Sequence, residues 1–222
     1  MSRHAAKGGK ANPYQKNDAF TQRAKKAGYP ARSVFKLEEI DKRAQILKAG
    51  QNVLDLGASP GSWAMYAASK IGRAGRLLAV DLSPLQTMLP VNAEFIQGDA
   101  FALDDEKLAR FAPYDVVLSD MAPATSGTPM QDQARSVDLF LRALAVAEKY
   151  TKPGGSFIGK IFMGEDFPSA RAEVRKVFEK ERLIRPESVH SVSFEIFVVG
   201  TGRRVPDVGT GRRAPDPESE GA

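Results

Sequence analysis

Residues 52–66, NVLDLGASPGSWAMY, decide the fold of this chain. A short apolar run stops at Asp55, a loop with Gly57 and Gly61 follows, and a helical pattern starts after the loop. A buried strand that turns sharply into a helix is typical of open α/β sheets, which bind their ligands beyond the carboxyl ends of the strands. Glycine lets the backbone come close to a ligand because it has no Cβ. We therefore expect a binding site at this loop.

Strand and helix patterns alternate through the rest of the chain. Apolar runs such as DVVL at 115–118 suit strands buried on both faces, as in a parallel sheet. The last two expected strands are separated by about two residues, too few for a helical crossover, so they should be antiparallel. The expected strands are 52–56, 76–82, 93–97, 114–119, 155–163, 186–191 and 194–201. The expected helices are 17–28, one from an N-cap at Ser33 to Gly50, 61–71, 104–111, 131–151 and 168–181. These patterns predict an α/β, Rossmann-like fold: a mostly parallel seven-stranded sheet with an antiparallel last strand and helices on both faces.

The composition suits one globular domain. Of the 222 residues, 42% are hydrophobic, enough for one core with little left for a second. We expect a flexible basic arm over 1–16, a single domain over 17–202 and a disordered tail over 203–222. The chain has no cysteine and only two histidines, His4 and His190, which excludes thiolate and histidine-rich metal sites, and we expect no metal. No apolar stretch reaches membrane-spanning length and no charged-then-apolar leader opens the chain, so we expect a cytoplasmic protein that does not act at a membrane.

Charge is distributed unevenly along the chain. Residues 1–50 contain twelve Lys or Arg against four Asp or Glu, whereas the remainder contains twenty against twenty-three. A cationic end on a nearly neutral body suggests a polyanionic partner held by phosphate contacts, such as a nucleic acid.

The loop after the first strand lacks the G-x-G-x-x-G of a dinucleotide fold and resembles the D-x-G-x-x-x-G signature of S-adenosylmethionine-dependent methyltransferases. Two further acids support a nucleoside ligand. Asp81 ends the second expected strand, where a carboxylate accepts hydrogen bonds from ribose hydroxyls. Asp99 follows the third strand, a position that suits an acceptor for the adenine amino group.

Four residues in separate motifs are candidates for chemistry. Lys160 lies in an apolar strand, where an ammonium group is costly unless it is paired, although it could also extend to solvent at the strand end. Asp120 ends the fourth strand and Glu195 begins the last. Lys36 lies on the second helix, where an exposed lysine would be ordinary if the residue is taken alone.

The motifs that hold these residues occur together and in order: SVFKLEEI, DLGASPG, SDMAPATSGTP, PGGSFIGKIF and EIFVVGTGRR. They resemble the FtsJ/RrmJ (RlmE-type) family of RNA 2′-O-ribose methyltransferases over residues 17 to about 204. The resemblance implies the S-adenosylmethionine-dependent methyltransferase fold and a Lys-Asp-Lys-Glu tetrad on Lys36, Asp120, Lys160 and Glu195. It implies cofactor contacts at Gly61, Trp63, Asp81, Asp99 and Asp120, beside the close approach expected at Gly57. The chain departs from the family pattern at Ser62, where a third glycine is common, and at Phe194, where many relatives carry a basic residue.

The resemblance implies methyl transfer from S-adenosyl-L-methionine to a ribose 2′-hydroxyl, at a uridine of 23S rRNA in the large ribosomal subunit. It implies no DNA substrate, and we expect a monomer. Lys160 would accept the proton or stabilise the developing alkoxide, because lysine becomes a base only where its surroundings favour the neutral form. The remaining alternatives are methylation of tRNA or mRNA caps, base N-methylation, a nicotinamide dehydrogenase, and a non-catalytic RNA-binding or ribosome-assembly factor.

Basic residues near the start of the chain would grip RNA phosphates and lead toward Lys36. They are Arg3, Lys7, Lys10, Lys16, Arg23, Lys25, Lys26 and Arg32.

Overall fold

The computed structural model of the chain describes residues 13–189 and 193–205, with side chains from residue 19. The helices are α1 (Pro13–Lys26), α2 (Val34–Ala44), α3 (Ser62–Ile71), α4 (Asp105–Leu108), α5 (Pro129–Tyr150) and α6 (Phe167–Val177). The strands are β1 (Asn52–Leu56), β2 (Arg76–Asp81), β3 (Ala93–Gln97), β4 (Tyr114–Ser119), β5 (Thr151–Phe162), β6 (Phe178–Ile184) and β7 (Glu195–Arg203). None of these helices combines the length and the apolar character that crossing a membrane requires.

The strands form one seven-stranded sheet in the order β3-β2-β1-β4-β5-β7-β6. Neighbours from β3 to β5 are parallel, whereas β7 lies between β5 and β6 and is antiparallel to both. The predicted fold is therefore confirmed, including the antiparallel last strand. Since β1 and β4 are adjacent, the ends of the strands before Gly57 and Asp120 lie side by side.

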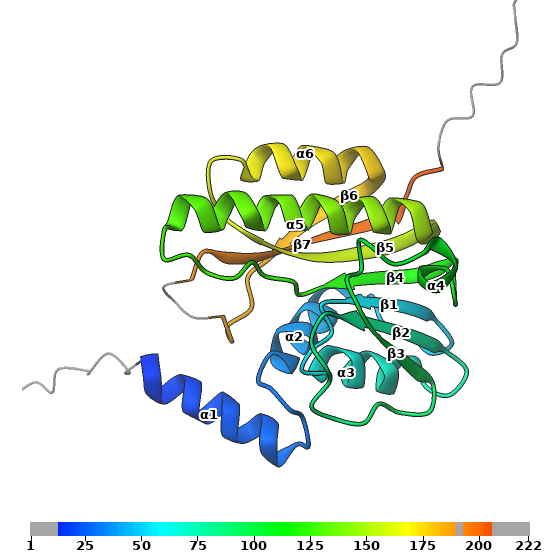
Figure 1. The fold of residues 1–222 in the computed structure, drawn as a ribbon, viewed down its shortest axis with the longest axis horizontal. Helices are drawn as coiled ribbons and strands as arrows, with labels where there is room; N and C mark the ends of the chain where they lie inside the picture. The colour runs from blue at the N-terminus through cyan, green and yellow to red at the C-terminus, as the bar shows by residue number, and fades with distance from the viewer. Residues whose placement is uncertain (1–12, 190–192, 206–222) are drawn as a thin grey trace, which may run out of the picture.

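Helices cover both faces of the sheet (Figure 1). On one face, α2 and α3 pack against the sheet through residues such as Leu37, Ile40 and Ile71. On the other, α5 and α6 pack through residues such as Phe140 and Val174. Burial of these apolar side chains on both faces is what the continuous apolar strands predict.

The sixth strand lies elsewhere than predicted. Residues 186–191 were expected to form it, but β6 covers Phe178–Ile184, and the last four residues of the helix predicted at 168–181 belong to this strand. β6 is an edge strand between a buried Phe178 and a buried Ile184, and most of its charged residues are exposed, whereas the Glu181 side chain is buried in ion pairs with Arg171 and Arg175 of α6. Charged residues are common on edge strands because they prevent further strand pairing, and this composition resembles that of an exposed helix. His190 and its two successors lie outside the described residues.

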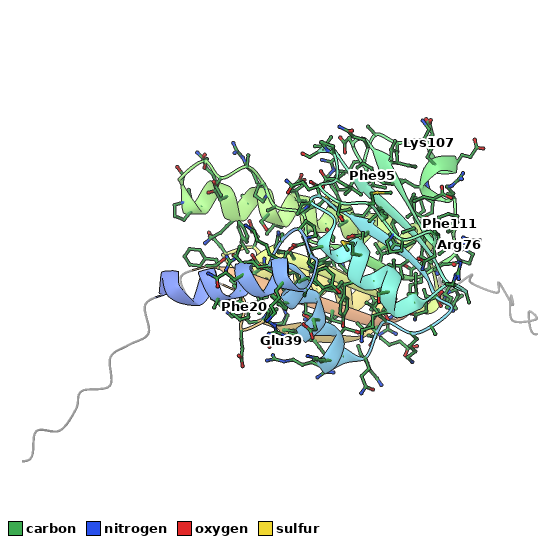
Figure 2. All side chains as sticks on the ribbon, turned by 90° about the horizontal axis from the view of Figure 1, so that it is seen from below. Phe20, Glu39, Arg76, Phe95, Lys107 and Phe111 are labelled. Atoms are coloured by element: carbon green, nitrogen blue, oxygen red, sulfur yellow. The ribbon has the colours of Figure 1, made fainter. Side chains whose placement is uncertain are left out.

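The ends of the domain also differ from the predictions. α1 begins at Pro13, four residues inside the predicted arm, and β7 continues to Arg203, the first residue of the predicted tail. Proline suits the first turn of a helix because its missing N–H would have no partner there. The rest of the arm, 1–12, and of the tail, 206–222, lies outside the described residues. Figure 2 shows α1 along the outside of the molecule, with Phe20 close to Glu39 of α2.

Candidate active site

A cavity of about 350 Å³ lies where the carboxyl ends of β1 to β4 meet. Four predicted site residues line it: Gly57 after β1, Asp81 at the end of β2, Asp99 after β3 and Asp120 after β4. The parallel arrangement of these strands places their ends at one edge of the sheet, which is where ligands bind in this class of fold. The volume is within the range of small-molecule sites.

The loop between β1 and α3 depends on its glycines. Gly57 and Gly61 have φ angles of +78° and +113°, which disfavour other residues. A Cβ on Gly57 would lie 2.5 Å from Cγ of Met121, so the loop packs closely against the segment after β4. The loop is also fastened to β2, because the N–H of Ser59 donates to Asp81 Oδ2 at 2.9 Å. Substitution of Gly57, which lines the cavity, would therefore move the cavity wall.

The two acids predicted to hold a nucleoside are positioned by backbone hydrogen bonds. Asp81 Oδ1 accepts the N–H of Ser83 at 2.7 Å, in addition to the bond from Ser59. Asp99 Oδ1 accepts the N–H of Phe101 at 2.9 Å. Because a carboxylate oxygen can accept two hydrogen bonds, both side chains are oriented and still able to accept one from a ligand.

Two predicted cofactor contacts, Gly61 and Trp63, do not line this cavity. The Trp63 side chain is buried, its Nε1–H donates to the carbonyl oxygen of Ser33 at 2.9 Å, and its ring lies 5.6 Å from that of Phe197. Ser33 is at the N-cap position of α2 without a side-chain capping bond. The indole therefore holds α2 against α3, and any contact of Trp63 with a cofactor would come from its backbone.

The four tetrad residues form two ion pairs. Lys36 Nζ lies 2.6 Å from Glu195 Oε1, and Lys160 Nζ lies 3.0 Å from Asp120 Oδ1. Lys160 is directly opposite Phe197 in the β5–β7 pair, and Lys36 Nζ lies 5.9 Å from the centre of the Phe197 ring. Phe197 therefore lies beside the Lys36 ammonium group and opposite Lys160 in the sheet.

Burial and pairing decide the charge states in this cluster. The Lys160 side chain is 7% exposed and also donates to the backbone carbonyl of Asp120, so it does not extend to solvent. Burial alone lowers the pKa of Lys36, but Asp120 and Glu195 outweigh it and raise the pKa above its ordinary value. Lys36 is therefore a stable cation and a poor base. The polar contacts of Lys160 within the described residues are to Asp120.

Sequence reasoning did not single out Asp55 as a site residue. It is fully buried, and within the described part of the chain neither carboxyl oxygen has a hydrogen bond or an ion pair. Burial, with smaller contributions from Asp120 and Asp81, raises the pKa of Asp55 well above its ordinary value. The sequence could have indicated Asp55, because it is an acid inside an otherwise apolar strand. Burial of such a group without a partner is unfavourable in free energy, which suggests a functional reason for it.

The chemistry of this cavity suits S-adenosylmethionine. Carboxylates at Asp81, Asp99 and Asp120 match a ligand that carries hydroxyls, an amino group and positive charge, whereas they would repel the pyrophosphate of a dinucleotide. Gly57 leaves space that a Cβ would fill. Across residues 13–189 and 193–205, no three His, Cys, Asp or Glu side chains are grouped so as to hold a metal ion.

Comparisons with known proteins agree with this geometry. Residues 29–203 match the model of the FtsJ-like methyltransferase family. The chain is 62% identical over 193 residues to ribosomal RNA large subunit methyltransferase E of Sorangium cellulosum, which covers 87% of this chain and 91% of the relative. It is 46% identical over 195 residues to the protein of that name from Bdellovibrio bacteriovorus, covering 86% and 99%.

A solved structure supports the same assignment. The crystal structure of a Plasmodium falciparum protein described as a ribosomal RNA methyltransferase superposes with a TM-score of 0.69 at 26% identity, covering 79% of this chain and 98% of the other. With a family match over most of its length and close relatives of the same kind, this chain belongs to the FtsJ-like methyltransferase family.

Proposed function

We propose that this protein is an enzyme that transfers a methyl group from S-adenosylmethionine to a ribose 2′-hydroxyl of RNA, at a uridine of 23S rRNA in the large ribosomal subunit. The observation that carries the proposal is the buried Lys160–Asp120 pair at the edge of a cavity that suits a nucleoside. The names of the relatives, which concern ribosomal RNA of the large subunit, support the choice of substrate. We place the activity in the cytoplasm, where ribosomes are assembled.

The residues around the cavity would bind and orient the methyl donor. Asp81 would accept hydrogen bonds from the ribose hydroxyls and Asp99 from the adenine amino group, while Gly57 would allow close approach of the backbone. When bound, S-adenosylmethionine supplies a methyl group that its sulfonium already activates. The protein's task is therefore to position the acceptor hydroxyl and to manage one proton.

Lys160 is the group we assign to that proton. Asp120 orients the ammonium from two directions, through its carboxylate and its backbone carbonyl. In this position Lys160 would accept the proton of the 2′-hydroxyl or donate a hydrogen bond to the developing alkoxide. Lys36, a stable cation paired with Glu195, would support the arrangement and attract the RNA backbone.

The ribose itself explains the choice of RNA, because DNA lacks the 2′-hydroxyl.

The proposal is tested with tritiated S-adenosylmethionine, offered with large ribosomal subunits, naked 23S rRNA or tRNA. We expect label in the large subunit, and on the sugar of uridine after nuclease digestion. Label in tRNA would indicate the tRNA alternative, label on a base would indicate an N-methyltransferase, and RNA binding without label would indicate an assembly factor.

Replacing Lys160 tests the catalytic assignment. In Lys160→Ala we expect methyl transfer to fall by at least about 10²-fold, the usual loss for a general acid–base group, while calorimetric binding of S-adenosylmethionine stays within a few-fold. Lys152→Ala is the matched control, since Lys152 lies at the start of the same strand, where its half-exposed side chain pairs with Asp115 and does not line the cavity. Full activity in Lys160→Ala would refute the role.

A further inference from the structure

Two cavities meet at the residues that follow β3. The cavity described above extends to Ala100, Phe101 and Arg142, and a second cavity of about 320 Å³ starts from the same three residues. The second cavity lies beside α5 and α4, from which Val146 and Leu108 contribute to its lining. The side chains at this junction decide whether the two spaces are separate.

Arg142 and Phe101 form the junction. The guanidinium carbon of Arg142, on α5, lies 3.9 Å from the centre of the Phe101 ring, a cation–π contact. The backbone of Phe101 is itself attached to Asp99, whose Oδ1 accepts its N–H. Asp99 is the residue expected to bind the adenine amino group. The stacked pair therefore lies just beyond the place where that amino group would be.

The second cavity has the chemistry of an apolar extension. Leu103, Leu108 and Val146 supply apolar surface. Its polar groups are already paired with one another: Asp105 accepts the hydroxyl of Tyr150 at 2.6 Å and lies 2.5 Å from Lys149 Nζ. Because these polar groups already bond to one another, they are less available to bind a polar ligand. The apolar side chains that line the cavity would instead contact an apolar substituent.

Resting on the proposed use of S-adenosylmethionine, we infer that Arg142, stacked on Phe101, is a specificity-determining residue. The pair closes the adenine end of the cofactor cavity, so that only an unsubstituted amino group fits. The exclusion is steric, because the exposed Arg142 lines both cavities and its side chain lies across the junction against the Phe101 ring. Rejection by a blocking side chain is a common way to discriminate between similar ligands. Removing the side chain would join the two cavities.

Calorimetric binding tests the inference without requiring catalysis. S-adenosylmethionine and its N6-benzyl derivative are titrated into the wild-type protein, Arg142→Ala, Phe101→Ala and Arg142→Met. In the wild type we expect the benzyl derivative to bind at least about tenfold more weakly than the parent, equivalent to about 1.4 kcal/mol. In Arg142→Ala and Phe101→Ala the two dissociation constants should converge to within about threefold. Arg142→Met, which keeps the length without the charge, should still discriminate.

The control is Arg135→Ala, an exposed arginine two turns earlier on α5, which should behave like the wild type. Equal binding of both ligands by the wild type would overturn the inference, and so would an unchanged ratio in Arg142→Ala. If Arg142→Ala no longer bound S-adenosylmethionine while the other variants did, the inference would also be overturned. A side chain that only blocks the N6-benzyl group should not be needed to bind S-adenosylmethionine. Failure of the wild type to bind S-adenosylmethionine would refute the cofactor proposal itself.

Discussion

At the scale of single residues, the buried acids differ in whether they have partners. Asp41 is buried on α2, where its oxygens accept the N–H of Leu47 at 2.9 Å and the hydroxyl of Tyr66 at 3.2 Å. Asp55 is buried without such bonds. A carboxyl group of this kind lowers stability, and it lies directly before the loop that we assign to the methyl donor. We interpret Asp55 as a residue retained for binding rather than for folding.

Asp55→Asn should therefore stabilise the ligand-free protein. The pKa of Asp55 is raised in the folded state, so the folded state binds the proton more tightly than the unfolded chain. The contribution of Asp55 to the free energy of unfolding is therefore most favourable below the unfolded pKa, about 3.9. This contribution is lost as the pH rises through the folded pKa. We expect Asp55→Asn to be more stable than the wild type by about 1–3 kcal/mol at pH 7, with the difference shrinking toward pH 4.

Urea denaturation between pH 4 and 8 measures this effect. The control is Asp115→Asn on the neighbouring strand, because the Asp115 carboxylate accepts the N–H of Asn52 at 2.7 Å. That substitution should destabilise the protein instead. A destabilised Asp55→Asn variant at pH 7 would show that Asp55 has a stabilising partner.

The Lys36–Glu195 pair should show strong energetic coupling. Both side chains are mostly buried, with 15% and 12% exposed, so removing one partner leaves the other charge poorly solvated. A double-mutant cycle with Lys36→Met and Glu195→Gln should give a coupling free energy of about 1–3 kcal/mol in thermal or chemical unfolding. The same cycle on the exposed Glu38–Lys42 pair should give less than about 0.5 kcal/mol. Equal coupling in both cycles would contradict our description of the site.

At the scale of elements, α1 is attached more loosely than the helices on the sheet. Its described contacts to α2 centre on Phe20, whose ring lies 5.6 Å from that of Phe35, and on Arg23, whose guanidinium lies 4.3 Å from the Phe35 ring centre. Ala24 is buried. Figure 1 shows that the rest of the helix extends away from the sheet. Few of its described side chains therefore hold α1 to the rest of the molecule, and Ala24 is the one of them that is buried in the core.

Phe20→Ala should release α1 selectively. Loss of the contact between Phe20 and Phe35 removes apolar packing that holds the helix, so hydrogen exchange over residues 13–26 should accelerate while β1 and β4 stay protected. Mass spectrometry of exchanged peptides would show this. Lys25→Ala, at an exposed position on the same helix, should leave exchange nearly unchanged. Faster exchange across the whole sheet would mean that α1 belongs to the cooperative core.

At the scale of the whole molecule, positive charge is concentrated in the N-terminal part of the sequence. The excess of Lys and Arg lies in residues 1–50, which include α1 and α2, and the tetrad residue Lys36 is on α2. Within the described residues, Lys25 and Lys26 of α1 are exposed. The basic part of the sequence thus includes a residue of the site, which suits RNA held by phosphates.

Deleting residues 1–12 should weaken RNA binding and reduce its dependence on salt. The deletion removes Arg3, Lys7 and Lys10, so the slope of log K against log salt should fall by up to about 2 to 3, at roughly 0.7 to 0.9 for each lost contact. Filter binding of 23S rRNA fragments between about 50 and 200 mM salt would measure the slope. Replacing the three residues by glutamine in the full chain controls for length. An unchanged slope would exclude phosphate contacts by this segment.

Most of the fold could be predicted from the sequence because it depends on local patterns, and so could the residues that line the cavity at the strand ends. The apolar strands, the glycine loop and the acids at strand ends are short-range features, and each appeared where the structure has it. β6 could not be predicted, because FEKERLI is charged enough to read as an exposed helix and becomes a strand only by pairing with β7.

By itself, the sequence determined the order of strands and helices, the edge of the sheet that carries the cavity and the four polar residues at the site. Only the tertiary structure decided which of those residues are partners: Lys36 pairs with Glu195 and Lys160 with Asp120. It also decided that Asp55 is buried without a hydrogen-bond partner among the described residues and that Arg142 stacks on Phe101. The physical reason is that pairing and burial depend on distances between segments far apart in the chain, which local composition does not encode.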